Sequence, residues 1–157
     1  MRVLVGGVGY RNLRDYSLGP HVADLLAERA ADGVEVEDLS YGPVQITHNL
    51  KARPQYDRLV LVGAVGRGRR PGTVVCYRWD GVLPAAEEVQ ARVAEAVTGV
   101  ISLDNVLVVC GAFGGLPGDV RVVEIEPADE GWGEGLSQAV ESNLPEVIEA
   151  VWSSTKP

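Results

Sequence analysis

The sequence predicts a single α/β domain over residues 1–157, a three-layer sandwich in which helices cover both faces of a central sheet of about five strands. Two observations predict this class. Short apolar runs alternate along the chain with longer stretches whose apolar residues recur at helical spacing. In addition, the run at 58–65 (RLVLVGAV) is apolar almost throughout, which is typical of a strand covered on both faces.

The first half of the chain contains five predicted elements. In order, they are a buried strand at 2–6, a helix at 18–31, a half-exposed strand at 34–39, a short helix at 43–51 and the central strand at 58–65. The first helix has one apolar face, formed by Leu18, Val22, Leu25 and Leu26. The glycine-rich segment that follows the central strand predicts a turn.

The second half predicts a strand at 73–79, as a hairpin arm or a sheet edge, a helix from Pro84 to about Val97, strands at 105–110 and 120–126, and a last helix over about 136–153. Pro84 suits the first turn of its helix. The inner side of that helix is predicted to carry Ala85, Val89, Val93 and Ala96. Ser137 is the expected cap of the last helix.

Composition narrows the function classes. The net charge of −8 disfavours general nucleic-acid binding, because phosphates would meet mostly repulsion. No apolar run approaches the roughly 20 residues that span a bilayer, and the N-terminal residues do not resemble a signal peptide. Cys76 and Cys110 lie in apolar runs without metal-binding spacing. We therefore expect free thiols and a cytoplasmic location.

Basic residues gather between positions 51 and 78, which hold seven of the 14 lysines and arginines and one acid, Asp57. Arg67, Arg69 and Arg70 lie in the turn after the central strand, where the ligand crevice of an open α/β sheet is found. Arginine forks bind carboxylates and phosphates. The turn is therefore a candidate anion or peptide site, and the alternative is a solvated turn.

Familiar cofactor and nucleophile motifs are incomplete. Gly7-x-Gly9-x-x-Asn12 lacks the third glycine of the dinucleotide fingerprint, and no helix starts directly after it. The segment at 66–72 has no P-loop lysine, and the chain has no Gly-x-Ser-x-Gly elbow. Dinucleotide, P-loop and serine-hydrolase chemistry are not expected.

Another set of motifs follows in a consistent order. The first strand ends in a glycine cluster, Asp15 and Gly19 come next, and three further motifs occur downstream: Pro71-Gly72-Thr73, Ile125-Glu126-Pro127 and Gly135-Leu136-Ser137. This order resembles the nickel–iron hydrogenase maturation endopeptidases over nearly the whole chain. The resemblance implies their α/β fold and, as a partner, a hydrogenase large-subunit precursor.

The resemblance also implies a metal site, but the matching positions lack its ligands. The family's acid after Asp15 is Tyr16 here, the aspartate that ends the central strand is Gly63, and the histidine position is matched by Gly99. A tyrosine phenol titrates near 10 and cannot replace a carboxylate at neutral pH. Because a catalytic metal needs about three protein ligands, we expect no metal ligands and no cofactor, whereas the resembled family uses nickel.

Relocated ligands are the alternative. The chain has two histidines, His21 and His48, and a relocated site would be built around Asp15, His48 or Asp104. A lone histidine such as His21 is more often a packing or surface residue. Asp15 has a purely structural interpretation as a cap for the helix that follows it.

Three hypotheses follow. The first is a metal-site-degenerate member of the family that binds a hydrogenase large-subunit precursor or assists its assembly without cleaving it. In this case Tyr16 points toward the former metal position, and the glycines leave space there. The second is an active, metal-dependent aspartic-type endopeptidase that uses relocated ligands to trim the C-terminal tail of the large subunit. The third is a small anion-binding domain. None of these hypotheses fixes an oligomeric state.

Overall fold

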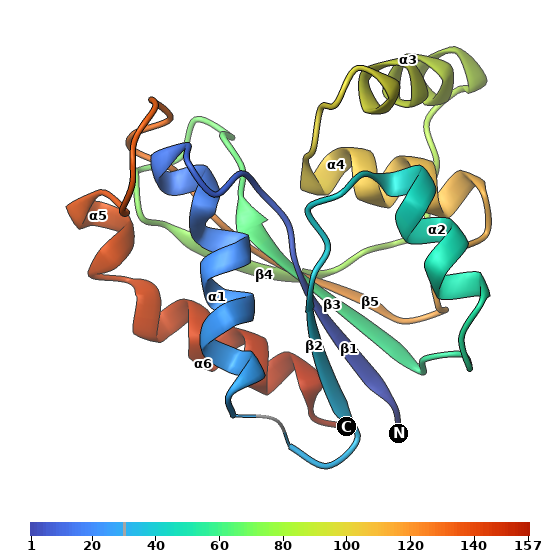
Figure 1. Cartoon of the computed structure of the whole chain (residues 1–157), viewed down its shortest axis with the longest axis horizontal. Helices are drawn as coiled ribbons and strands as arrows, with labels where there is room; N and C mark the ends of the chain where they lie inside the picture. The colour runs from blue at the N-terminus through green and yellow to red at the C-terminus, as the bar shows by residue number, and fades with distance from the viewer. Residues whose placement is uncertain (30) are drawn as a thin grey trace.

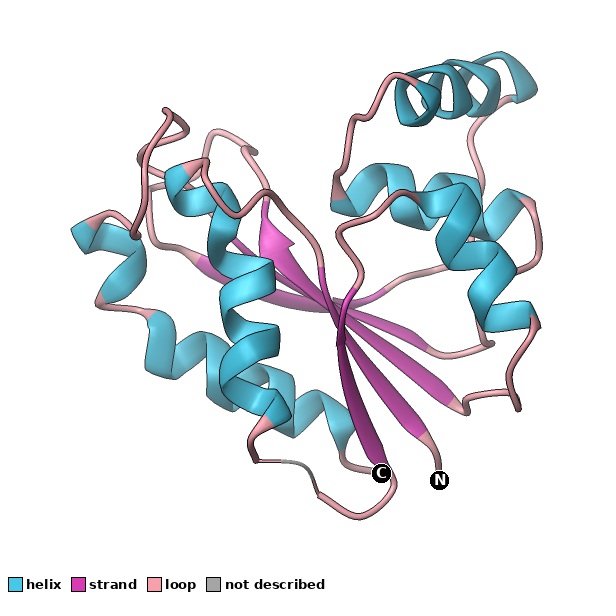
Figure 2. Cartoon of the chain, viewed as in Figure 1, coloured by secondary structure: helices cyan, strands magenta, loops and turns pink. Residues whose placement is uncertain are grey.

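The computed structural model describes residues 1–29 and 31–157 (Figure 1). Five strands form one sheet in the order β2-β1-β3-β5-β4, with helices on both faces (Figure 2). The strands are β1 Val3–Gly7, β2 Val34–Asp38, β3 Arg58–Ala64, β4 Val74–Arg78 and β5 Val120–Ile125. The predicted α/β class, with a five-stranded sheet between helical layers, is confirmed.

The two helical layers come from different parts of the chain. The helices α1 (Leu18–Ala27) and α6 (Leu144–Thr155) lie on one face, while α2 (Pro43–Lys51) and α4 (Leu103–Asn105) lie on the other (Figure 1). Shorter segments complete the first layer: η1 (Arg14–Ser17) leads into α1, and α5 (Gln138–Glu141) precedes α6. In the described part of the chain, no helix has both the length and the apolar character needed to cross a bilayer.

Strand alternation produces two separate cores. Val60 and Val62 of β3 pack on the α1 and α6 side, whereas Leu59 and Leu61 pack on the α2 and α4 side. Successive strand residues point to opposite faces, so a continuous apolar run is what a strand with two covered faces requires. All four side chains are at most 1% exposed, which confirms β3 as the central strand.

The segment at 105–110 was predicted as a strand and is helical instead. It continues α4 as a π-helical turn, η2 (Val106–Cys110), and its apolar side chains are mostly buried. The helix begins at Ser102, whose Oγ accepts a hydrogen bond from the Asn105 N–H at 3.1 Å. A short apolar run has the same composition in a buried strand and in a buried helix, so periodicity does not separate them. The Ser102 cap was the missed signal.

Other boundaries also differ from the predictions. The strand predicted at 73–79 is β4. Of the two predicted placements, a hairpin arm or a sheet edge, the sheet edge is confirmed, because β4 pairs antiparallel with β5 and not with β3. The helix predicted at 18–31 ends at Ala27, and its residue 30 lies outside the described residues. The last helix is broken in two, and Ser137 caps only its short first part, α5.

The predicted inner side of the helix α3 (Ala86–Val97) is only partly covered: Val89, Val93 and Ala96 are half-buried, whereas Ala85 is exposed. None of the α3 residues is fully buried, and Val89 and Val93 line a shallow hollow together with Phe113. Figure 1 shows α3 standing above α4, farther from the sheet than the other helices.

The topology fixes where a site can form. The strands β1, β3 and β5 are mutually parallel, so their carboxyl ends meet at one edge of the sheet. Ligands of open α/β sheets bind outside this edge. The loops that follow these strands carry most of the residues singled out in the sequence.

Candidate functional site

Asp15 is fully buried and anchors a loop that is distant in the sequence. Its carboxylate accepts hydrogen bonds at 2.8 Å from the backbone N–H groups of Ala128, Asp129 and Ser137 and from the Ser137 hydroxyl. It makes no capping hydrogen bond to α1, so its structural interpretation as a cap of the following helix is wrong. Asp15 instead holds the loop at 128–137 over the carboxyl end of the sheet.

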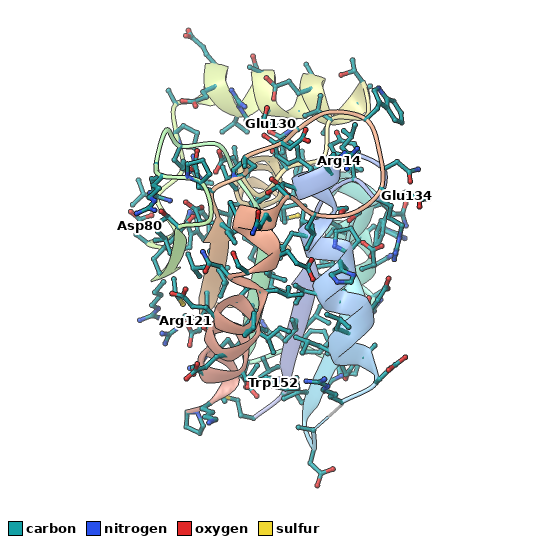
Figure 3. All side chains as sticks on the ribbon, turned by 90° about the vertical axis from the view of Figure 1, so that its left-hand side faces the viewer. Arg14, Asp80, Arg121, Glu130, Glu134 and Trp152 are labelled. Carbon is teal, nitrogen blue, oxygen red and sulfur yellow. The ribbon has the colours of Figure 1, made fainter. Side chains whose placement is uncertain are left out.

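Further backbone contacts join this loop to the one before α1. The Arg14 N–H donates to the Gly133 carbonyl at 3.2 Å, and the Gly133 N–H donates to the Asn12 carbonyl at 2.9 Å. The Arg14 guanidinium donates to the Glu134 carbonyl at 3.1 Å. Figure 3 shows Arg14, Glu130 and Glu134 together at this end of the molecule, away from Trp152.

Tyr16 lies beneath the same loop. Its hydroxyl donates to Glu130 Oε1 at 3.3 Å, and it lies 3.9 Å from where a side chain at Gly66 would begin. Burial, followed by the neighbouring Glu130 carboxylate, raises the pKa of Tyr16 above its ordinary value. The phenol therefore stays protonated at neutral pH and acts as a hydrogen-bond donor.

Gly63, at the end of β3, is enclosed by the chain itself. A Cβ atom there would lie 2.7 Å from the Val8 carbonyl oxygen and 3.3 Å from the Leu103 side chain. The expectation that glycine leaves open space at this position is therefore wrong for Gly63.

The structure does not pack Gly99 against Gly63. Gly99 has a φ of +92°, and a Cβ atom there would meet no described residue within 4 Å. Its carbonyl accepts a hydrogen bond from the Tyr10 hydroxyl at 3.1 Å. Asp104 directly follows Leu103, the residue that contacts Gly63. The contacts around Gly63 therefore favour Asp104 over Gly99 as the candidate nearer the end of β3.

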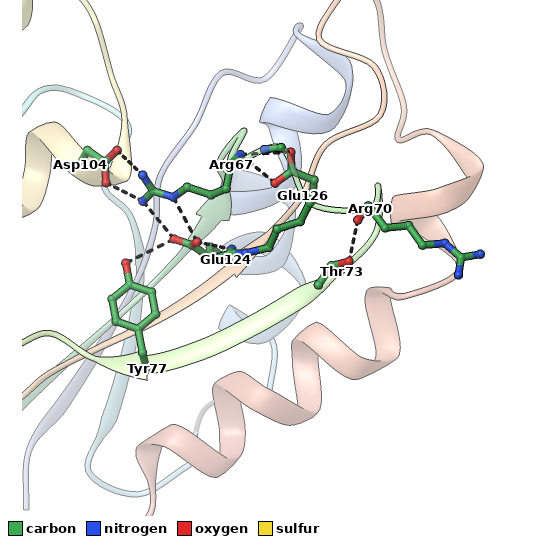
Figure 4. Close-up of polar contacts among 9 residues, drawn as sticks. Arg67, Arg70, Thr73, Tyr77, Asp104, Glu124 and Glu126 are labelled. Atoms are coloured by element: carbon green, nitrogen blue, oxygen red, sulfur yellow. Dashed lines mark hydrogen bonds and ion pairs between the residues drawn. The ribbon is translucent and has the colours of Figure 1, made fainter.

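Arg67 and Asp104 form a bidentate ion pair. Arg67 Nη1 and Nη2 donate to the two Asp104 oxygens at 3.0 and 2.8 Å (Figure 4). The other edge of the same guanidinium, Nε and Nη2, faces Glu124 at 3.3 Å from each oxygen. Hydrogen bonds to these two carboxylates raise the pKa of Arg67 further above its ordinary value. One arginine thus joins the loop after β3 to α4 and β5.

Glu124 is the buried centre of this cluster, with a side chain only 1% exposed. Besides Arg67, it accepts from Arg69 Nη1 at 2.7 Å and from the Tyr77 hydroxyl at 3.3 Å. Burial, together with the Glu124 charge, raises the pKa of Tyr77 to about 12. A buried carboxylate is tolerated when it is both paired and hydrogen-bonded, as here.

The three arginines of the loop therefore differ in role. Arg67 and Arg69 pair with carboxylates of this chain, while the Arg70 side chain extends away from the cluster (Figure 4). The loop backbone is held separately, because the Glu126 carboxylate accepts the N–H groups of Arg67 and Gly68. Arg67 and Arg69 thus lie in an exposed turn, but their guanidinium groups are paired with carboxylates of this chain.

The histidines do not complete a metal site with Asp15. His48 is exposed on α2 and lines a hollow with Val44 and Phe113, and the hydrogen bonds to the Asp15 side chain come from the loop at 128–137. His21 is half-buried on α1. Within residues 1–29 and 31–157, no three His, Cys, Asp or Glu side chains gather in a way that would hold a metal ion.

Sequence reasoning missed Glu124, Glu130 and Tyr77 as members of these clusters. A signal for Glu124 was present, because it interrupts the apolar strand VRVVEI close to an arginine-rich turn. An acid within a buried strand requires a cationic partner. No local pattern pointed to Glu130, which reaches Tyr16 through a loop.

Comparison with known proteins identifies the fold. No protein-family model matches the sequence, and no curated protein matches it. Solved structures do match over nearly the whole chain. The hydrogenase maturating endopeptidase HybD from E. coli is 24% identical, with a TM-score of 0.73, and the match covers 98% of this chain and 91% of HybD.

Two archaeal structures agree. The hydrogenase 2 maturation peptidase from Thaumarchaeota archaeon SCGC_AB-539-E09 is 23% identical, with a TM-score of 0.69 and coverage of 99% of this chain and 98% of the peptidase. The [NiFe] hydrogenase maturation protease HybD from Thermococcus kodakarensis is 20% identical, with a TM-score of 0.68 and coverage of 99% and 100%. The resemblance to this family found in the sequence is thereby confirmed at the level of the fold.

Proposed function

We propose that this chain, which has the fold of the hydrogenase maturation proteases, binds a hydrogenase large-subunit precursor or assists its assembly without cleaving it. The observation that carries the proposal is the state of the matched ligand positions. Tyr16 is a protonated phenol bonded to Glu130, and Gly63 has no room for a side chain beside the Val8 carbonyl. Neither group is a donor for a divalent metal, so the residues present do not fit the nickel site of the resembled family.

The scaffold around these positions supports a binding role. Asp15 and Glu126 still hold the two loops that border the carboxyl edge of the sheet. The free thiols Cys76 and Cys110 suit a reducing compartment, so we place this activity in the cytoplasm.

The experiment is a co-purification of the tagged chain with a large-subunit precursor that retains its C-terminal tail, followed by mass spectrometry of that tail. We expect capture of the precursor with the tail intact, whether or not Ni²⁺ is added. A large subunit that lacks the tail is the matched control for tail-dependent binding. Loss of the tail in the presence of Ni²⁺ would establish the active endopeptidase, and failure to capture the precursor would reject the assembly role.

Metal titration separates the degenerate site from relocated ligands. The ligand candidates for an active enzyme are Asp15, His48 and Asp104, but Asp15 is saturated by the loop at 128–137 and Asp104 is paired with Arg67. We expect calorimetry with Ni²⁺ or Zn²⁺ to show no single tight site. One stoichiometric site that is lost in His48→Ala would contradict the proposal and favour the endopeptidase.

A further inference from the structure

The Arg67 guanidinium has two edges in different surroundings. The inner edge is fixed by Glu124, whose side chain is 1% exposed and which is also bound by Arg69. The outer edge is occupied by Asp104, whose side chain is 43% exposed. A guanidinium held from behind by a buried acid presents a planar, preorganised fork, the geometry that binds a carboxylate with two parallel hydrogen bonds.

The present occupant of the outer edge is replaceable. Asp104 is partly in water already, so its release to solvent adds little desolvation change, in contrast to Glu124. Asp104 lies at the start of the helical segment 103–112, in which α4 passes directly into the π-helical turn η2. Single π-helical turns are rare and occur often at functional sites.

The Arg67–Asp104 pair lies in the wall of a pocket of about 510 Å³. Ligand pockets commonly have volumes of about 300–1,000 Å³. The walls beyond the ion pair combine apolar and polar groups. The loop after β4 and η2 supply apolar side chains: Trp79, Val82, Leu83, Pro84, Leu107 and Val108. β4 and α3 supply the polar ones: Tyr77, Glu88 and Arg92. Val82 is 71% exposed, so the chain leaves part of this apolar wall uncovered.

We propose that this pocket binds the terminal carboxylate of an apolar ligand on the Arg67 fork, that the ligand is a peptide C-terminus ending in an apolar residue, and that Asp104 closes the fork in the free protein. Exchange of one carboxylate for another on the same guanidinium yields little affinity, so the apolar wall supplies the rest. Asp104 is thus an autoinhibitory carboxylate. The peptide source rests on the proposed function, whereas the fork itself does not.

The test uses the purified full chain and three probes: acetyl-valyl-leucine with a free carboxylate, the same dipeptide as its amide, and hexanoate. Binding is measured by calorimetry or NMR titration for wild type, Asp104→Ala and Arg67→Lys. The matched control is Asp24→Ala. Asp24 forms another bidentate ion pair, with Arg11 at 2.7 and 3.1 Å, and neither residue lines this pocket. Circular dichroism checks the fold of each variant, and Asp104→Asn replaces Asp104→Ala if the latter unfolds.

We expect Asp104→Ala to bind the free-acid dipeptide at least about tenfold more tightly than wild type, since a charge-assisted bidentate contact is gained without competition. The amide should not bind, Arg67→Lys should lose binding, and Asp24→Ala should equal wild type. Equal binding by Asp104→Ala and wild type, or equal binding of acid and amide, would overturn the proposal. Hexanoate bound as tightly as the dipeptide would keep the fork and reject the peptide as its ligand. None of these outcomes depends on capture of a large-subunit precursor.

Discussion

Two buried carboxylates at the same end of the sheet are stabilised in different ways. Asp15 is surrounded by backbone N–H groups and one hydroxyl from a single loop, whereas Glu124 is surrounded by the side chains of Arg67, Arg69 and Tyr77. Backbone donors cannot leave without unfolding their loop. Arginine side chains can exchange partners while the backbone stays in place. The Asp15 region is therefore a structural anchor, and the Glu124 region is where ligand exchange is feasible.

The largest effect is expected from Asp15→Ala. The substitution leaves three backbone N–H groups of the loop at 128–137 without their acceptor, so we expect a loss of about 3–4 kcal/mol in the free energy of unfolding. Urea denaturation measures it. The control is Asp24→Ala, an exposed partner of Arg11, which should change stability by less than about 0.5 kcal/mol. Similar losses in both variants would remove the distinction between an anchoring carboxylate and an exposed one.

Arg67→Ala should follow with a loss of about 2 kcal/mol, because Asp104 loses its partner and the buried Glu124 retains only Arg69 and Tyr77. Arg70→Ala, in the same loop, should be nearly neutral. The alternative of a solvated turn, offered by the sequence, would instead make all three arginines nearly neutral for stability. If thermal denaturation finds the two single variants equal, the Glu124 cluster does not stabilise the fold.

Gly63→Ala tests the crowding between the two regions. The added Cβ would lie 2.7 Å from the Val8 carbonyl oxygen, which is a backbone atom and moves only with its strand end. Overpacking of this kind costs about 1–3 kcal/mol. Gly118→Ala is the control, since apart from the chain neighbours of Gly118 no described residue lies within 4 Å of the added Cβ. A tolerated Gly63→Ala, measured by the same denaturation, would mean that room for a ligand side chain exists at this position.

The layers and the central strand were predictable because they follow from apolar patterning. The continuous run of β3 and the helical spacing of α1 both require burial, and both were assigned correctly. The segment at 105–110 was not predictable in this way, because an apolar run this short fits either a strand or a buried helix.

The site was less predictable than the layers, for a related reason. Asp15 and Glu124 acquire their partners from segments more than 45 residues away, and a local sequence pattern does not reveal such contacts. The arginine turn was singled out in the sequence as a candidate anion or peptide site, and that function stays a prediction. The carboxylates that pair with Arg67 come from β5 and α4, which lie beside the turn only in the folded chain.

The smallest effect concerns the proton of Tyr77, whose pKa of about 12 arises first from burial and then from Glu124. Because the folded-state pKa is raised, the contribution of Tyr77 to stability is complete below pH 10 and is lost as the pH rises toward 12. Glu124→Gln should lower the pKa of Tyr77 and leave it above 10, since burial remains. Ultraviolet titration of the phenolate, with Tyr77→Phe to assign the signal, measures the shift. An unchanged pKa of Tyr77 in Glu124→Gln would mean that Glu124 carries no charge beside Tyr77. The comparison between Glu124, which is held by side chains, and Asp15, which is held by backbone donors, would then lose its electrostatic basis.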